Sequence, residues 1–546
     1  MKLTSRSWKK KGSGYRGGIG EGSTAPGKGS FGIAALLLGP AVVLGAFVLY
    51  LRTLAPTILP YSLPDLADAA VLQMQACSLS MTHPTGYPTW TMLAHLVTYL
   101  PFGDCAYRVN LASAIFAALA ALAVYAAGLL LTRSAAGAAV GALAFALTSV
   151  LWSQAVIAEV YTMNAFFLGL ALGALLLWRQ RQRDRYLLLS ALLVGLAMTN
   201  HLTSGLLIPA ALLLVALVDR SRFRDLGLVL KAAGLFVVGL LPYLFLPLRA
   251  PSAPMKANNP DNLERFLFVV GGGDLTGGFF AYGPAELPGR LAMYWEYLLQ
   301  SFNAPLIVAG AAGLGVLALR DPAVALFTGF LFVGWGFHAV GNAIVDVQLY
   351  FIPTYVIFAV WISCGVAALL GWLSEFGRGA PGLAGKAAFA AVCAALLLLP
   401  LIGVRETYAA NDWSGNYEAA ETLDTVAENA ARDATVLHLR SPLWYMVIVE
   451  ERRQDLTLVD PFQDTEPGRY NDMVWPGDFG PEETSRIYGT DGETGVEAAR
   501  KAARRGPVYL LAHDALDLGP LREAGFRPEL IDDSFYRLVP PDGAGA

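Results

Sequence analysis

Charged residues are scarce in this chain of 546 residues. They make up 15% of it, whereas hydrophobic residues make up 55% and the mean hydropathy is +0.49. Soluble domains carry about 25% charged residues, so the composition excludes an ordinary soluble protein. The net charge of -4 also provides no basic surface of the kind that nucleic acids require. The sequence therefore predicts a membrane protein without a nucleic-acid partner.

Cysteine is rare as well, and the four cysteines form no zinc-binding pattern. Cys364 and Cys393 lie in apolar segments, whereas Cys77 and Cys105 flank one polar stretch and either form a disulfide or stay free. The sequence has no P-loop, and residues 271–274 lack the strand and helix of a dinucleotide site. It shows no internal repeat of the kind found in inverted-repeat transporters. Nucleotide-dependent and zinc-dependent functions thus find no support.

Long apolar runs dominate the sequence instead. Residues 31–51 are 21 nearly uninterrupted apolar residues, enough to cross a hydrocarbon core about 30 Å thick at about 1.5 Å per residue. Further runs predict an α-helical polytopic membrane protein with about 11 transmembrane helices. The further runs cover residues 106–131, 135–152, 156–178, 186–200, 202–218, 226–248, 302–319, 323–341, 351–373 and 385–404.

The amino-terminal tail predicts the orientation of these helices. Residues 1–30 carry seven lysine or arginine residues against one glutamate, and such basic ends stay in the cytoplasm. An odd number of spans then places the first long loop, residues 52–105, and everything after Arg405 on the outer side. We therefore expect a multi-pass protein of the plasma membrane, with residues 31–404 as the transmembrane domain.

Residues 405–546 change sharply in composition. They contain 27 acidic and 14 basic residues, and helix-like and strand-like segments follow one another. We expect helices near 414–431, 442–453 and 494–505, and strands near 434–439, 456–460, 508–511 and 535–539. Alternation of this kind predicts a small soluble α/β domain, which the topology places on the outer side.

The first outer loop holds the strongest candidates for chemistry. Asp65 and Asp68 lie three residues apart, and residues 83–88 read His-Pro-Thr-Gly-Tyr-Pro. If the first segment is helical, the two carboxylates share one face, where they can hold and deprotonate a hydroxyl. His83 precedes a proline, which favours an extended backbone. The same loop can alternatively be a rigid turn without a chemical role.

Other polar residues lie at the expected outer ends of the spans. Each has a structural alternative: Glu159 can cap a helix, His201 can be hydrated at the interface, Asp346 can belong to a turn, and Arg108 can anchor a helix end. Ionisable groups at membrane depth are nevertheless functional candidates by default. The candidates for substrate binding are His83, Tyr87, Arg108, Asn110, Glu159, Tyr161, Asn164, Asn200, His201, Asp346 and Tyr350.

Several of these motifs together are similar to a known family. They are Asp65-x-x-Asp68, the 83–88 loop, Tyr-Arg-Val-Asn at 107–110, Glu-Val-Tyr-Thr-Met-Asn at 159–164 and Asp-x-Gln-x-Tyr-x-x-Pro at 346–353. The pattern resembles the bacterial relatives of the transmembrane protein O-mannosyltransferases, within the GT-C glycosyltransferase superfamily. The chain departs from that pattern at Asp68, where the family usually has glutamate. The resemblance covers about residues 50–355 and does not reach the carboxy-terminal domain.

The resemblance implies a glycosyltransferase that uses a polyprenyl-phosphate sugar and acts on the outer face. Asp65 would then be the general base and Asp68 would bind sugar hydroxyls or orient the acceptor, although the two roles can be exchanged. His83, Arg108 and His201 would meet the charge of the leaving phosphate. No cofactor is expected, and a divalent metal at the two acids is a minor option. The acceptor would be a protein or a glycolipid; the alternative function is a transporter or flippase of lipid-linked sugars.

Overall fold

The computed structural model of this protein describes most of the chain. The described residues are 33–60, 68–81, 83–255, 259–273, 278–344, 346–377, 383–438, 442–459, 493–512, 518–532 and 534–541. Asp65, the expected base, therefore lies outside the described residues, as does the basic tail.

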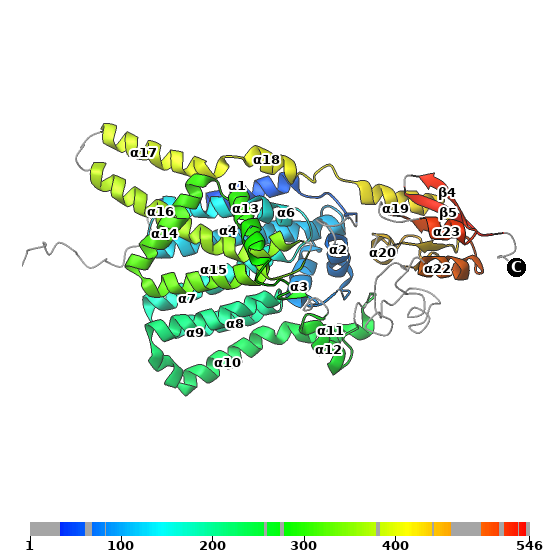
Figure 1. The fold of residues 1–546 in the computed structure, drawn as a ribbon, viewed down its shortest axis with the longest axis horizontal. Helices are drawn as coiled ribbons and strands as arrows, with labels where there is room; N and C mark the ends of the chain where they lie inside the picture. The colour runs from blue at the N-terminus through cyan, green and yellow to red at the C-terminus, as the bar shows by residue number, and fades with distance from the viewer. Residues whose placement is uncertain are drawn as a thin grey trace, which may run out of the picture.

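A bundle of helices forms the larger part of the molecule (Figure 1). Its helices up to residue 249 are α1 (Ile33–Thr53), α2 (Ala69–Ser78), α3 (Pro88–Val97), α4 (Cys105–Thr132), α5 (Ala135–Ala146), α6 (Ser149–Ala155), α7 (Tyr161–Arg181), α8 (Arg185–Met198), α9 (Leu207–Val218), α10 (Leu226–Leu240) and α11 (Phe245–Arg249). The remaining ones are α12 (Leu263–Val270), α13 (Leu287–Ser301), α14 (Ala304–Arg320), α15 (Pro322–Val340), α16 (Ile352–Gly377), α17 (Leu383–Leu398) and α18 (Val404–Ala410).

Each predicted apolar run coincides with an apolar helix or a bent pair of helices. Among the described residues, six helices are long and apolar enough to cross a membrane, or up to eight if each bent pair counts as one span. The shorter apolar helices include residues 185–198 and 202–218, which the sequence divides at Asn200-His201. The structure thus confirms a multi-pass helical protein, whereas the number of eleven spans stays a prediction.

The outer helices of the bundle show why it needs a lipid environment. Leu230 and Val237 of α10 are 62% and 57% exposed, and Val308 of α14 is 68% exposed. A run of such side chains would form a large apolar patch in water. In a bilayer the same side chains contact hydrocarbon.

Glycines allow two central helices to approach closely. A Cβ atom on Gly313 of α14 would collide with the backbone of Trp361 in α16, and one on Gly365 would collide with the backbone of Ala309. Because lipid provides no hydrophobic force between helices, such close contact supplies the dispersion energy that holds membrane helices together. The helices α4, α5, α7 and α16 pack together around the core of the bundle.

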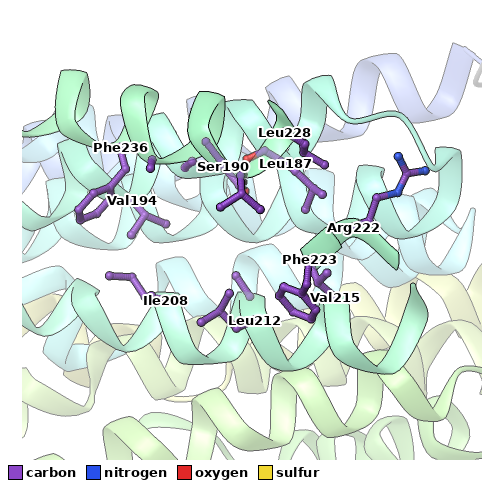
Figure 2. A pocket seen from close by; sticks show the side chains of 15 residues that line it. Leu187, Ser190, Val194, Ile208, Leu212, Val215, Arg222, Phe223, Leu228 and Phe236 are labelled. Carbon is purple, nitrogen blue, oxygen red and sulfur yellow. Dashed lines mark hydrogen bonds between the residues drawn. The ribbon is translucent and has the colours of Figure 1, made fainter. Parts of the chain in front are cut away.

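An apolar cavity of about 380 Å³ lies between α8, α9 and α10. Figure 2 shows leucine, valine and phenylalanine side chains around it and Arg222 at one end. Arg222 is paired with Asp184 at 2.8 Å and Asp219 at 2.9 Å. Apart from Ser190 and Arg222, the residues that line the cavity are apolar, and none of the candidate site residues is among them.

The carboxy-terminal domain is a small α/β unit at one end of the bundle, beyond α2 and α3 (Figure 1). Its described strands form one sheet in the order β2-β1-β3-β5-β4, in which β1, β2 and β3 are parallel and β5 pairs antiparallel with β3 and β4. The elements are α19 (Glu418–Asn429), β1 (Thr435–Leu437), α20 (Leu443–Ile448), β2 (Thr457–Val459), α22 (Glu493–Ala503), β3 (Val508–Leu511), α23 (Gly519–Glu523), β4 (Arg527–Asp532) and β5 (Phe535–Val539). The structure confirms the helices and strands expected here and adds α23 and β4.

Candidate active site

The first part of the site is the connection between α2 and α3. Asp68 occupies the N-cap position of α2, and its carboxylate makes no capping hydrogen bond there. His83 Nε2 lies 3.5 Å from Asp68 Oδ2 and 3.2 Å from the Tyr87 hydroxyl. The Asp68 and His83 side chains are 39% and 30% exposed, so water or a substrate can reach both. A carboxylate beside an imidazole is an arrangement that can accept and hold a proton.

Buried contacts fix this connection. Pro88 starts α3 at a position where its missing N–H removes no hydrogen bond, and the preceding Tyr87 adopts a left-handed conformation. Gln75 of α2 donates hydrogen bonds to the Gly86 carbonyl oxygen at 3.0 Å and to Thr91 of α3 at 2.7 Å. Gly86 has φ +78°, and a Cβ atom there would meet Leu246 at 3.0 Å. The residue types of the motif therefore set its backbone path.

Glu159 is the second acidic residue of the site. It lies between α6 and α7 and is 5% exposed. Ser113 and Trp90 each donate a hydrogen bond to its backbone carbonyl oxygen, at 3.2 and 3.1 Å. Its carboxylate accepts a hydrogen bond of 3.3 Å from the Val160 N–H, just before α7, whereas no side chain at the N-cap position caps this helix. Burial, and then the charges of Asp68 and Asp346, raise the pKa of Glu159 well above its usual range.

Aromatic and imidazole rings form the wall next to Glu159. The Tyr161 ring lies 5.4 Å from that of His201 and 6.0 Å from that of Tyr350, and its hydroxyl donates to Asp346 Oδ2 at 3.5 Å. Burial lowers the pKa of His201 to about 4, with a smaller effect from the charge of His338. His201 is therefore a neutral imidazole at physiological pH, able to both donate and accept hydrogen bonds.

The two parts of the site meet at α3, where Trp90 donates a hydrogen bond of 3.1 Å to the Glu159 carbonyl oxygen. Burial raises the pKa of Tyr87, and the charges of Asp68, Tyr350, Glu159 and Asp346 raise it further. Tyr87 thus lies within the field of four groups from three separate segments. The structure brings together Asp68, His83, Tyr87, Glu159, Tyr161, His201, Asp346 and Tyr350.

Two predicted binding residues instead hold the backbone. The Asn110 side chain donates to the Ala55 and Thr57 carbonyl oxygens, at 3.0 and 3.3 Å, and accepts from Gln73 at 2.8 Å. The Arg108 guanidinium donates to the carbonyl oxygens of Thr98, Gly103 and Asp104. Both side chains therefore donate their hydrogen bonds to backbone carbonyl groups of residues 55–104.

The two remaining predicted asparagines lie at the edge of the site. Asn164 accepts a hydrogen bond of 2.6 Å from Ser204, and Asn200 donates one of 3.2 Å to the Val160 carbonyl oxygen. Both tie the start of α7 to the segment after α8. The Asn200 side-chain oxygen is buried and has no hydrogen-bond partner among the described residues, so it can receive a substrate hydroxyl.

Two further polar residues were not among the predicted site residues. His338 lies in the apolar helix α15, which favours a structural role, yet its ring lies 5.9 Å from that of Tyr350. Gln154 is 3% exposed, and its side-chain oxygen has no partner within the described ranges. Buried groups without partners are uncommon and call for an explanation such as a ligand. Gln154 belongs to the Trp-Ser-Gln motif at 152–154, which is one of the motifs that carry the family resemblance.

Metal binding finds no additional ligands here. Within the part of the chain that the structure describes, no group of three or more histidine, cysteine, aspartate or glutamate side chains is placed to hold a metal ion. The cluster offers carboxylates, phenols, imidazoles and amides around a partly buried centre. That set suits a ligand with many hydroxyl groups, such as a sugar.

Comparison with solved structures defines the class of the fold. ArnT from Cupriavidus metallidurans, solved with undecaprenyl phosphate, matches 94% of this chain and 99% of its own with a TM-score of 0.55 and 14% identity. AglB from Archaeoglobus fulgidus, an archaeal oligosaccharyltransferase solved with an inhibitory peptide and a dolichol-phosphate, matches 88% of this chain and 70% of its own, with a TM-score of 0.51 and 14% identity. The chain has the fold of the GT-C membrane glycosyltransferases.

Sequence comparison narrows the class. Residues 68–223 match the family model of the protein O-mannosyl-transferase TMEM260 N-terminal domain. Protein O-mannosyl-transferase TMEM260 of Mus musculus is 33% identical over 233 residues, which cover 41% of this chain and 32% of that protein. The Dictyostelium discoideum protein of that name is 23% identical over 352 residues, covering 57% of this chain and 43% of its own length. The chain spans less than half the length of these curated relatives, and it is similar to them in the segment that carries most of the site.

Proposed function

We propose that this protein transfers a sugar, in our reading mannose, from a polyprenyl-phosphate donor to an acceptor hydroxyl. The observation that carries the proposal is the overlap of the O-mannosyl-transferase match, residues 68–223, with a buried cluster of carboxylates, phenols and imidazoles. Six of the eight clustered residues lie within that segment. The resemblance of the sequence motifs points to the same class of enzyme.

The proposed step is a displacement at the anomeric carbon of the sugar. A carboxylate of the pair Asp65 and Asp68 takes the proton of the acceptor hydroxyl, and the acceptor oxygen forms the new bond to the anomeric carbon. The bond from that carbon to the phosphate oxygen breaks, and its electron pair leaves with the polyprenyl phosphate. General-base assistance of this kind contributes typically about 10² to 10⁴ in rate. Asp65 remains our choice for the base. His83 lies next to the Asp68 carboxylate and would hold it in place.

The buried side of the cluster suits the sugar of the donor. Tyr161, His201 and Tyr350 provide flat ring faces together with hydroxyl and imidazole groups, and such groups can bind sugar hydroxyls by hydrogen bonds. The lipid carriers in ArnT and AglB support a polyprenyl-phosphate donor. The names of the curated relatives support mannose.

Two observations support an extracytoplasmic site. Cys77 and Cys105 form a disulfide next to the site, and disulfides persist in oxidising compartments outside the cytosol. The basic tail of residues 1–30 favours a cytoplasmic amino terminus. We therefore place the reaction and the carboxy-terminal domain on the extracytoplasmic face of the plasma membrane, where a protein or glycolipid hydroxyl is the acceptor.

Transfer of radiolabel from a panel of polyprenyl-phosphate sugars tests the proposal. Membranes that contain the intact chain should label protein or glycolipid from one donor, and Asp65→Asn and Asp68→Asn should each lower this transfer strongly. Both variants need to be present at the wild-type amount. If no donor is used and both variants still move lipid-linked sugar across vesicles, the protein is a flippase and the proposal is wrong.

A further inference from the structure

The helix α2 lies between the bundle and the carboxy-terminal domain. Leu72 and Ala76 of α2 pack in the main core of the bundle, whereas Ala70 and Met74 pack with the core of the carboxy-terminal domain. Residues four apart lie on one face of a helix, so Ala70 and Met74 form a stripe toward that domain. Since Asp68 directly precedes α2, the position of this helix sets the position of its carboxylate.

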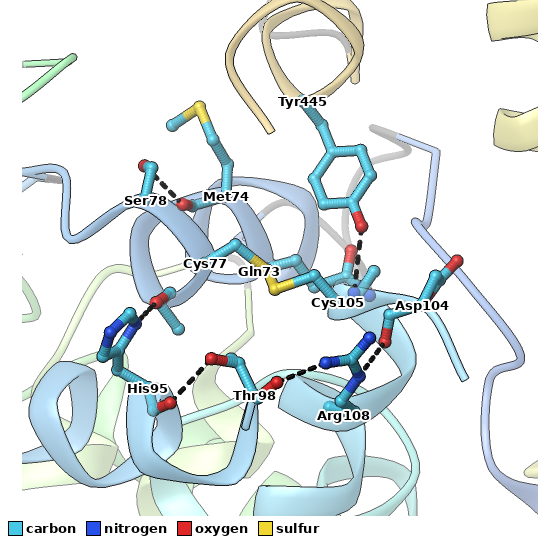
Figure 3. Close-up of a disulfide and its surroundings, with 12 residues drawn as sticks. Gln73, Met74, Cys77, Ser78, His95, Thr98, Asp104, Cys105, Arg108 and Tyr445 are labelled. Carbon is cyan, nitrogen blue, oxygen red and sulfur yellow. Dashed lines mark hydrogen bonds between the residues drawn. A yellow bond between two sulfur atoms is a disulfide. The ribbon is translucent and has the colours of Figure 1, made fainter. Parts of the chain in front are cut away.

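A tyrosine of the carboxy-terminal domain reaches the same region. Tyr445 of α20 is 2% exposed, and its hydroxyl accepts a hydrogen bond of 3.0 Å from the Ala106 N–H in the first turn of α4. The first N–H groups of a helix have no partner within the helix. Tyr445 therefore caps α4 from another domain, as Figure 3 shows.

A disulfide carries this contact to α2. Cys105 is the first residue of α4, next to Ala106, and it is bonded to Cys77 in the last turn of α2. Figure 3 shows the disulfide between α2 and the start of α4, next to the backbone that the Tyr445 hydroxyl contacts. Arg249 also donates to the carbonyl oxygens of Ser78 and Leu79 at the end of α2, at 3.0 and 2.9 Å. The end of α2 is thus fixed from the bundle and from the carboxy-terminal domain.

The helix α2 also contacts the 83–88 loop. Gln75 of α2 donates to the carbonyl oxygen of Gly86 and to Thr91, while Asp68 faces His83. A small rotation of α2 would change the Asp68 position and the 83–88 loop together. Misplacement of a catalytic group by about 1 Å can lower a rate by about 10².

We propose that Tyr445 is a positioning residue: its hydroxyl fixes the first turn of α4 and, through the Cys77–Cys105 bond, holds α2 so that Asp68 faces its substrate. This inference rests on the proposed glycosyl transfer. It gives the carboxy-terminal domain a role in the chemical step, in addition to any contact with acceptors. Because Tyr445 is almost wholly buried and its hydroxyl is bonded to the Ala106 N–H, its loss should change turnover without changing donor affinity.

Tyr445→Phe is the test, because it removes one hydroxyl and keeps the ring. The chain offers a matched control in Tyr509→Phe: the Tyr509 hydroxyl accepts a hydrogen bond of 3.1 Å from the Ala431 N–H inside the carboxy-terminal domain. Full-length protein in lipid nanodiscs would be assayed with the active donor from the panel, using both a protein acceptor and a small soluble mimic. Hydrogen exchange of residues 69–78 would be measured without substrates.

We expect Tyr445→Phe to lower kcat about tenfold, equivalent to about 1.4 kcal/mol in the barrier, with both acceptors and with unchanged KM for the donor. Exchange in α2 should become faster. Tyr509→Phe should leave kcat and α2 exchange at wild-type values, even if it lowers the Tm by as much as Tyr445→Phe does.

Two results would overturn the inference. One is a Tyr445→Phe protein whose kcat and α2 exchange equal those of Tyr509→Phe. The other is a raised KM for the protein acceptor alone, which would show a docking role. If the wild-type protein transfers no sugar, the proposed function fails, and the exchange comparison still decides whether Tyr445 holds α2.

Discussion

Replacement of Asn110 by leucine separates a binding role from a structural one. The sequence motif predicts that Asn110 binds substrate, whereas the structure gives its side chain three protein partners. Asn110 is fully buried, and leucine has a similar size without hydrogen-bonding groups. We therefore expect Asn110→Leu to lower stability and to leave the KM for the donor unchanged.

The magnitude follows from the groups that lose a partner. The Ala55 carbonyl oxygen loses the bond from Asn110, while the Thr57 carbonyl oxygen and the Gln73 amide keep the 3.1 Å bond to each other. One fully unpaired buried carbonyl and two weakened groups correspond to about 2 to 4 kcal/mol. Gln73→Leu should lower stability through the same network, because Gln73 donates to Asn110 and to the Thr57 carbonyl oxygen. It also removes the acceptor of the Leu59 N–H.

Thermal unfolding followed by tryptophan fluorescence, together with donor kinetics, measures both effects. Asn303→Leu is a suitable control, because Asn303 also bonds a backbone carbonyl oxygen and caps a helix, at α14. In the Gln73→Leu/Asn110→Leu double variant the two losses should not add, with a coupling of about 1 kcal/mol or more. A raised donor KM with unchanged unfolding would refute the structural assignment and restore Asn110 to the binding site.

Three further results are expected. Cys77→Ala/Cys105→Ala opens a link across a sequence separation of 28 and should lower the unfolding free energy by roughly 3 to 4 kcal/mol, seen as a lower Tm; an unchanged Tm would count against it. Gly86→Ala places a side chain at φ +78° against Leu246 and should destabilise by about 1 to 2 kcal/mol in the same assay, unlike an alanine at the unobstructed Gly173. The raised pKa of Glu159 makes its contribution to stability complete below pH 4.5 and lost as the pH rises through that pKa; Glu159→Gln should weaken this pH dependence of Tm, and identical profiles would contradict it.

The membrane helices could be predicted because length and hydropathy are local properties of the sequence. Each apolar run is long enough to be recognised without knowledge of its neighbours. The strand β4 was missed for the opposite reason: it contains Pro528, and most of its residues are exposed, so it lacks the alternation that marks a half-buried strand. The helix α13 (Leu287–Ser301) was missed as well, because it lies between the predicted apolar runs 226–248 and 302–319 and is not itself a continuous apolar run.

The candidate site divides along similar lines. Residue type and position at the expected ends of spans were enough to select Glu159, Tyr161 and Tyr350, which the structure brings together, because polar groups at membrane depth are themselves a signal. They did not show that the Arg108 donors bind carbonyl groups of residues 98–104. Which way a carbonyl group points depends on the folded backbone, and the sequence does not show this.

Under the proposed function, the charges of the site divide it into a sugar side and a proton side. An ionised Glu159 close to Asp68 and Asp346 would repel a lipid phosphate, since two like charges 4 Å apart interact by about 4 kcal/mol at an effective dielectric constant of 20. Burial and the neighbouring carboxylates raise the pKa of Glu159, which lessens this repulsion, and His201 with a pKa of about 4 is neutral. In the proposed reaction this buried side would bind the uncharged sugar. Asp68 and His83 are partly exposed, and this is the side from which an acceptor hydroxyl can enter and where its proton can leave to water.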